Sequence, residues 1–199
     1  DKIFINTSGI GSVKAQIALS VSRIAQGDQI LVSGPMGNHG LAVMLSRADF
    51  SFDFNLKSDS ASIWPIVERL LEVGPALKFL RDPTRGGLAA TLNEMAAMST
   101  LGISIDESAI PLDQAVMSAS EILGIDPLQA ANEGKIVAVV EGGKTQKALE
   151  LMTETDLGKN ASIVGEFTRH RPGVVVMNTK IGGQRIIPEP SGELLPRIC

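Results

Sequence analysis

The chain has 199 residues, enough for one sizeable domain, and its core must be aliphatic because it has six Phe, one Trp and no Tyr. A formal net charge of −4 without a basic run argues against nucleic-acid binding. The sequence has no apolar stretch of membrane-spanning length and no signal-peptide pattern, and a single cysteine suits a reducing compartment. We therefore expect a cytoplasmic protein with no membrane partner.

Short apolar runs alternate with helical patterns along the chain. The runs predict strands at 2–6, 29–33, 77–80, 103–105, 136–140, 162–167 and 174–176. The helical patterns predict helices at 41–45, 63–71, 88–98, 111–123 and 145–152. Because strands and helices interleave, the pattern favours an α/β or α+β fold, with one mixed sheet and helices packed on one face.

The two ends of the chain differ from the rest. Residues 1–12 contain an expected strand followed by a Gly/Ser joint, and the strand begins without a preceding turn, after Asp1 rather than Met. We interpret them as the remnant of a longer polypeptide. Residues 13–187 form the expected domain. Residues 188–199 contain three prolines and a glycine, a composition typical of a semi-extended arm about 35 Å long.

Cys199, the only cysteine, is the last residue, so it cannot form an internal disulfide. It is either a stray surface thiol or a nucleophile at the tip of the arm. An arm that ends in one nucleophile suits the transport of a covalently bound group between two sites.

Two glycine-containing loops are candidates for phosphate binding, because backbone amides at a helix N-terminus bind anions. The loop at 34–40 is also readily explained as a tight turn. The loop at 82–87 is the stronger candidate, since it combines a carboxylate that can bind Mg²⁺, a hydroxyl, a guanidinium and two glycines at one helix start. Its alternative is helix capping by Asp82 or Thr84.

A third loop, residues 131–135, precedes the expected strand at 136–140. Glu133 in this loop is a candidate general base, held at the edge of a rigid strand. A solvated turn is the alternative. The two histidines have no partners at metal-ligand spacing, so a zinc site is not expected.

Four motifs together resemble the HypE family of hydrogenase maturation proteins, in order and over essentially the whole chain. They are Ser33–Gly40, Asp82–Gly87, Ala131–Lys135 and the terminal Pro196–Cys199. The terminal motif is highly specific. The Asp82–Gly87 motif is shared more loosely with the wider aminoimidazole-ribonucleotide-synthetase-like (PurM-like) ATP enzymes. The resemblance implies a PurM-like C-terminal α/β domain, which follows a missing N-terminal ATP-binding domain.

The resemblance also implies a reaction. In the family, the terminal cysteine receives a carbamoyl group from the carbamoyltransferase HypF, and ATP drives its dehydration to a thiocyanate. The cyano group then passes to iron on the HypC–HypD complex, as a ligand for nickel–iron hydrogenase. By this resemblance Cys199 would be the carrier nucleophile, Glu133 the base, and ATP and Mg the cofactors. The implied nucleotide- or phosphate-binding residues are Asp82 (also the candidate Mg ligand), Thr84, Arg85, Gly86, Gly87, Asn132, Lys135, Gly37, Asn38 and His39.

The chain is shorter than the members of the family, which have an upstream domain that this sequence does not contain. In the family, that domain supplies most of the ATP site and the dimer contact. We therefore expect the chain to be inactive alone, and we expect the full-length protein to form a homodimer. Two alternatives stay open. The first is another PurM-like ATP enzyme, such as a small-molecule kinase or amidine-forming synthetase. The second is a non-catalytic carrier or docking module.

Overall fold

The computed structural model describes residues 6, 8–13, 17–47 and 56–191. The strand expected at 2–6 falls almost wholly outside these residues, as does Cys199. The strands are β1 (Gln29–Val32), β2 (Leu77–Arg81), β3 (Gly102–Asp106), β4 (Val137–Val140), β5 (Ser162–Thr168), β6 (Val175–Asn178) and β7 (Gln184–Ile187). The α-helices are α1 (Asn38–Arg47), α2 (Trp64–Leu70), α3 (Gly87–Ser99), α4 (Gln114–Leu123) and α5 (Thr145–Thr153).

Short 3-10 helices complete the described secondary structure. They are Val21–Arg23, Leu71–Ala76, Glu107–Ala109, Pro127–Gln129, Gly142–Lys144 and Asp156–Gly158. Within the described residues, none of the helices combines the length and apolar character that a membrane crossing requires.

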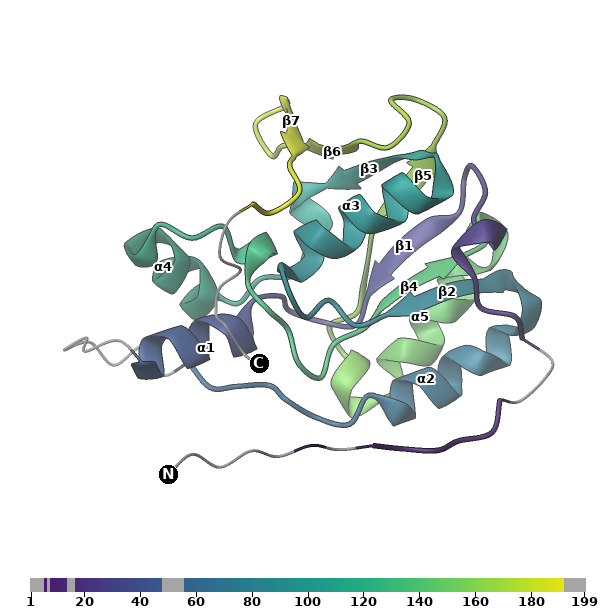
Figure 1. Ribbon diagram of the computed structural model, residues 1–199, viewed down its shortest axis with the longest axis horizontal. Helices are drawn as coiled ribbons and strands as arrows, with labels where there is room; N and C mark the ends of the chain where they lie inside the picture. The colour runs from purple at the N-terminus through teal and green to yellow at the C-terminus, as the bar shows by residue number, and fades with distance from the viewer. Residues whose placement is uncertain (1–5, 7, 14–16, 48–55, 192–199) are drawn as a thin grey trace.

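The strands form one seven-stranded sheet in the order β2-β4-β1-β5-β3-β6-β7 (Figure 1). Strands β3 and β6 are parallel, and all the other neighbouring pairs are antiparallel. The expected mixed sheet is therefore confirmed. Strand β7 was not expected from the sequence. It pairs with β6 at one edge of the sheet, and its side chains are exposed until Ile187.

Helices cover both faces of this sheet. Side chains alternate between the faces of a strand, and in β1 Ile30 packs in a core cluster with Leu92 of α3. Its neighbour Leu31 packs in a separate cluster with Ile66 of α2 and Ala148 of α5. Figure 1 shows α3 on one side of the sheet and α2 and α5 on the other. The expectation that the helices pack on one face was wrong. Strand β4 is accordingly buried along its whole length, as strands covered on both faces are.

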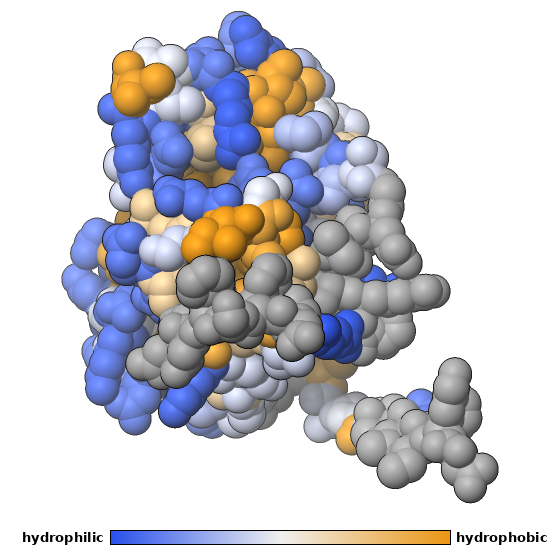
Figure 2. Space-filling model, turned by 90° about the vertical axis from the view of Figure 1, so that its left-hand side faces the viewer, coloured by the Kyte–Doolittle hydropathy of each residue, from blue (hydrophilic) through white to orange (hydrophobic). Residues whose placement is uncertain are grey.

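A third, smaller apolar cluster joins α1 and α4 beside the sheet. Leu41 of α1 packs there with Val116 and Ala119 of α4. Helix α1 begins at Asn38 rather than at residue 41, and α4 begins at Gln114 rather than at residue 111. Figure 2 views this end of the molecule, where separate apolar patches lie among hydrophilic side chains.

Candidate active site

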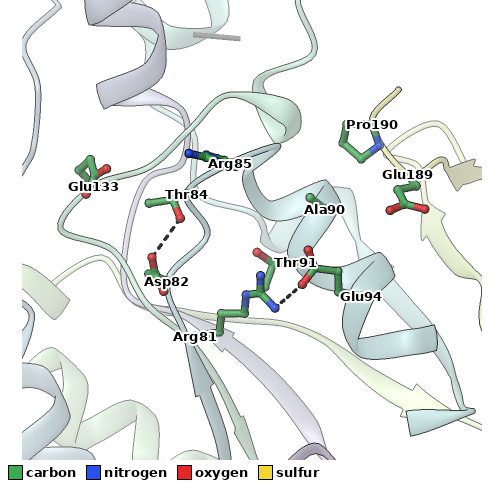
Figure 3. A pocket seen from close by; sticks show the side chains of 10 residues that line it. All are labelled: Arg81, Asp82, Thr84, Arg85, Ala90, Thr91, Glu94, Glu133, Glu189 and Pro190. Atoms are coloured by element: carbon green, nitrogen blue, oxygen red, sulfur yellow. Dashed lines mark hydrogen bonds and ion pairs between the residues drawn. The ribbon is translucent and has the colours of Figure 1, made fainter. Parts of the chain in front are cut away.

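A pocket of about 420 Å³ lies where β2 runs into α3 (Figure 3). It brings together four of the site residues expected from the sequence, namely Asp82, Thr84, Arg85 and Glu133. The remaining lining residues are Arg81, Ala90, Thr91, Glu94, Glu189 and Pro190. Two of the three candidate loops and the start of the C-terminal arm therefore meet at one hollow.

Three side chains of the Asp82–Gly87 loop line the pocket. The Thr84 hydroxyl donates a 3.0 Å hydrogen bond to the Asp82 carboxylate, and Asp82 and Arg85 are exposed. The residue that precedes α3 is Gly86, in left-handed conformation, and no side chain caps this helix. Capping of α3 by Asp82 or Thr84 was the alternative interpretation of this loop, and the structure does not support it.

Gly87 lets the start of α3 approach the chain before Asn132 closely. Its φ is +61°, and a Cβ at this position would lie 2.5 Å from the carbonyl oxygens of both Leu128 and Ala130. Any L-residue here would suffer both a disfavoured backbone conformation and a collision with backbone atoms. Glycine is therefore required by the geometry that brings these two loops together.

Asn132 joins all three candidate loops from beneath the pocket. Its Oδ1 accepts a 2.7 Å hydrogen bond from the Gly37 amide, and its Nδ2 donates 3.0 Å bonds to the carbonyls of Pro83 and Ala130. The side chain is buried. Asn132 and Gly37 bond to each other and do not line the pocket, so the nucleotide contacts expected of them stay predictions.

Asn38 and His39 lie in the first turn of α1 and outside the pocket lining. Asn38 Nδ2 donates a 2.6 Å hydrogen bond to the Asp113 carboxylate, and His39 Nδ1 lies 2.8 Å from Ser58 Oγ. The buried Oδ1 of Asn38 and Nε2 of His39 have no hydrogen-bond partner among the described residues. Contact of either residue with a nucleotide also stays a prediction.

Lys135, another expected nucleotide contact, is largely buried, and its ammonium pairs with the Asp59 carboxylate. Lys135 and Asp59 are 7% and 20% exposed at the side chain. Its stem passes Gly34, where an added Cβ would lie 3.5 Å from Lys135 Cε. The ammonium is therefore directed to a protein carboxylate, away from the set of side chains that line the pocket.

Two parts of the pocket were missed by reasoning from sequence. Arg81 forms an ion pair with Glu94, and both side chains line the pocket. Glu94 lies two helical turns after Gly87, so it projects from the face of α3 that begins at the glycine loop. That spacing was a usable signal, whereas the approach of Glu189 and Pro190 to the pocket depends on the unexpected strand β7.

The start of the arm is fixed to the same helix. The carbonyl of Ile187, the last residue of β7, accepts a 3.1 Å hydrogen bond from Asn93 Nδ2 of α3. Glu189 and Pro190 follow directly and line the pocket. The chain that leads to Cys199 therefore leaves the domain at the rim of this pocket.

Metal-binding potential is limited within the part of the chain that the structure describes. No group of three or more His, Cys, Asp or Glu side chains there is placed to hold a metal ion. Asp82 supplies one exposed carboxylate. One protein carboxylate together with substrate phosphates is a common way of binding Mg²⁺.

Residues 25–178 match the family described as AIR synthase related protein, C-terminal domain. The chain belongs to this family. All 199 residues of the chain align at 47% identity with a putative hydrogenase expression/formation protein of Methanocaldococcus jannaschii, of which they cover 59%. They align at 45% identity with the carbamoyl dehydratase HypE of Cupriavidus necator and cover 57% of it. The expected resemblance to HypE is confirmed, over less than two thirds of the relatives' length.

Solved structures agree with this assignment. A hydrogenase maturation protein HypE in complex with ATP has a TM-score of 0.84 at 40% identity, over 91% of this chain and 55% of that chain. A HypE–HypF complex has a TM-score of 0.83 at 44% identity, over 86% of this chain and 56% of that chain. The thiamine monophosphate kinase of Aquifex aeolicus has a TM-score of 0.53 at 16% identity, over 84% of this chain and 54% of that chain. This likeness shows a shared fold alone.

Proposed function

We propose that this AIR synthase related domain is the C-terminal part of an ATP-dependent carbamoyl dehydratase that matures hydrogenases. The supporting observation is the composition of one pocket, which gathers the Asp82–Gly87 loop, Glu133 and the start of the arm that ends in Cys199. The identity of 45% to a carbamoyl dehydratase HypE supports the same reaction. The low identity to the thiamine monophosphate kinase gives no comparable support to the kinase alternative.

The residues at the pocket fit the phosphates of a nucleotide. Arg85 supplies a guanidinium and Thr84 a hydroxyl beside the N-terminus of α3, whose amides carry partial positive charge. Asp82 is the proposed protein ligand of Mg²⁺. When bound, ATP supplies the phosphoryl group that converts the carbamoyl oxygen into a leaving group. The HypE structure solved with ATP supports this assignment.

The proposed reaction converts a carbamoyl group on the Cys199 sulfur into a thiocyanate. The carbon–oxygen bond breaks, the oxygen leaves with the phosphoryl group, and the nitrogen loses two protons as the carbon–nitrogen triple bond forms. Glu133 is the proposed acceptor of one nitrogen proton, because its carboxylate lies in the same pocket as the phosphate-binding side chains, and the departing phosphate takes the other. Water must be excluded when the arm docks, since it would hydrolyse the activated group.

Other proteins are needed before and after this step. We propose HypF as the carbamoyl donor, which the HypE–HypF complex supports, and the HypC–HypD complex as the acceptor of the cyano group. We also propose that the whole protein is a cytoplasmic homodimer. In it, residues 1–12 would follow an N-terminal ATP-binding domain, 13–187 would form the present domain and 188–199 the arm. The isolated chain would then lack dehydration activity.

Intact-mass spectrometry tests this function. A protein extended to the length of the relatives is treated with HypF and its carbamoyl donor, with and without ATP. We expect a carbamoyl adduct on the C-terminal peptide, followed by loss of one water only with ATP. Cys199→Ala should show neither change. Retained activity in this variant would favour another ATP enzyme of the same fold.

Glu133→Gln separates the enzyme from a docking module. The variant should still accept the carbamoyl group but dehydrate it at least about 100-fold more slowly, the usual effect of losing a general base. Glu121→Gln, at an exposed position of α4, is the control. Dehydration at the normal rate by Glu133→Gln would reject Glu133 as the base and favour the docking module.

A further inference from the structure

A segment between α1 and α2 rests directly on the loop that carries Glu133. We call residues 57–61 the strap. Gly134 has a φ of +70°, and a Cβ there would lie 2.4 Å from the Asp59 carbonyl oxygen and 2.7 Å from the Ala61 amide nitrogen. Only glycine permits so close an approach, so the two backbones are in contact at the residue after Glu133.

Two side-chain interactions hold the strap in this place. The Lys135 ammonium pairs with the Asp59 carboxylate, and Ser58 Oγ lies 2.8 Å from His39 Nδ1. The Lys135–Asp59 pair is largely removed from water, and salt screens such a pair much less than one at the surface. Loss of one partner would leave the other as an uncompensated buried charge. The strap is therefore bound to the loop by more than surface contacts.

Glu133 itself lies between two anchored neighbours. On one side, buried Asn132 bonds to three other parts of the chain. On the other side, Gly134 contacts the strap and Lys135 is paired with Asp59. Glu133 is the member of this run that reaches the pocket. Since a general base acts only within hydrogen-bonding reach of its proton, a displacement of about 1 Å would slow the reaction strongly.

We propose that Asp59 and Lys135, together with the strap, are positioning residues that hold Glu133 at the site of proton removal. This inference rests on the proposed function, because it explains why Glu133, the proposed base, is held in a fixed position. It gives Lys135 a role different from the phosphate contact expected of it. The strap contributes none of the pocket's lining residues, so its effect reaches the reaction through the loop.

The test measures dehydration of the carbamoylated, full-length protein carrying Asp59→Asn or Lys135→Met. We expect the maximal rate to fall by about 10- to 100-fold, while the KM for ATP and carbamoylation by HypF change less than twofold. Lys135→Arg, which retains the charge, should restore most of the rate. Lys159→Met is the matched control, because it breaks the exposed pair between Lys159 and Asp156. It should leave every parameter unchanged.

Ser58→Ala keeps the proposal testable if the charge variants do not fold. Ser58 is exposed, and this variant breaks two contacts of its hydroxyl, the one with His39 and the 3.2 Å hydrogen bond that it accepts from the Ser60 amide within the strap. It should lower the maximal rate about threefold without changing the KM. Normal rates in all the folded variants, or equal losses in rate and ATP binding, would overturn the positioning role. If Glu133→Gln is inactive while the strap variants are normal, only this inference fails. An active Glu133→Gln removes the proposed base as well.

Discussion

The loops beneath the pocket are joined by buried hydrogen bonds, whereas the charged side chains that line the pocket are partly or fully exposed. Below, buried Asn132 uses its side-chain oxygen and nitrogen to connect three loops. Above, Asp82 and Arg85 are exposed, and Arg81 and Glu94 are about 40% exposed at the side chain. The difference indicates that buried hydrogen bonds fix the loops, while the chemical groups that line the pocket stay accessible. Substitutions should therefore damage folding below the pocket and ligand binding above it.

Gly87→Ala should have the largest effect on stability. We expect it to lower the free energy of unfolding by about 4 kcal/mol, because the new methyl group meets two backbone carbonyls and the φ becomes strained. Chemical denaturation of the purified chain measures this. Gly124→Ala is the matched control, since its φ is +66° but a Cβ there contacts nothing within 4 Å. It should cost only about 1 kcal/mol. Equal losses would show that the close approach at Gly87 is not tight.

Asn132→Ala should destabilise the protein by about 3 kcal/mol. It leaves the Gly37 amide and the Pro83 and Ala130 carbonyls without their side-chain partner in a buried place. Thermal and urea unfolding measure the loss. Asn160→Ala, at an exposed position, should be nearly neutral. An Asn132→Ala variant with normal stability but weakened ATP binding would instead support the nucleotide contact expected from the sequence.

Glu94→Gln tests the role of the exposed side chains that line the pocket. It should change the free energy of unfolding by less than about 1 kcal/mol, as expected for an exposed ion pair. It also releases Arg81 within the pocket, so the affinity of the full-length protein for ATP should rise by about threefold at low salt. Isothermal titration calorimetry measures that affinity. Weaker ATP binding in Glu94→Gln would show that the carboxylate, rather than Arg81, is needed there.

The smallest expected effect is on pH dependence, away from the pocket. Hydrogen bonds from the hydroxyl and then the backbone amide of Ser108 hold the pKa of Asp106 below its usual value of 3.8. This carboxylate stabilises the fold above pH 3.8, and the contribution disappears as the pH falls through the lower folded-state pKa. Asp106→Asn should therefore lower the melting temperature slightly at pH 7. The difference should narrow below pH 3.8.

The control for this prediction compares Asp106 with Asp156 at low and high salt concentration. The pKa of Asp156 is also lowered, first by its hydrogen bond with Lys159 and then by the charge of that residue. At about 1 M salt the effect of Asp156→Asn should shrink, because salt screens exposed charges. The effect of Asp106→Asn should persist. If both effects shrink equally, charge rather than hydrogen bonding stabilises Asp106.

The apolar runs predicted most of the fold. The expected strands at 29–33, 77–80, 103–105 and 162–167 differ from β1, β2, β3 and β5 by one or two residues at their ends. The run at 136–140 was also sufficient to predict a strand covered on both faces, because it is apolar throughout. The order of strands and helices alone does not indicate how many faces of the sheet are covered, which explains the error about the helices. Strand β7 has only one buried side chain, Ile187, so the sequence carries no alternation to reveal it.

The sequence predicted the parts of the candidate site that are recognised by the chemistry of their side chains. It did not predict the parts whose position depends on contacts between loops. The Asp82–Gly87 loop and Glu133 were recognised by their residue types, and they share one pocket. The start of α1 was missed because Asn38, His39 and Gly40 favour helices weakly. Tertiary packing overrides that preference, since the Gly40 amide donates a 2.8 Å hydrogen bond to the Ala131 carbonyl. No local pattern could show that Asn132 is buried among three loops.

The hydrogen bond between Asn93 and Ile187 fixes one end of a tether. Nine residues follow Pro190 in the sequence, and they extend at most about 30 Å whatever path they take. Under the proposed function, a group on the Cys199 sulfur therefore stays within about 30 Å of Pro190, a residue that lines the pocket. Conversion of that group would be first order, and its rate would not change when the protein is diluted. Supply by HypF, a second-order encounter between two proteins, would limit turnover at low concentration.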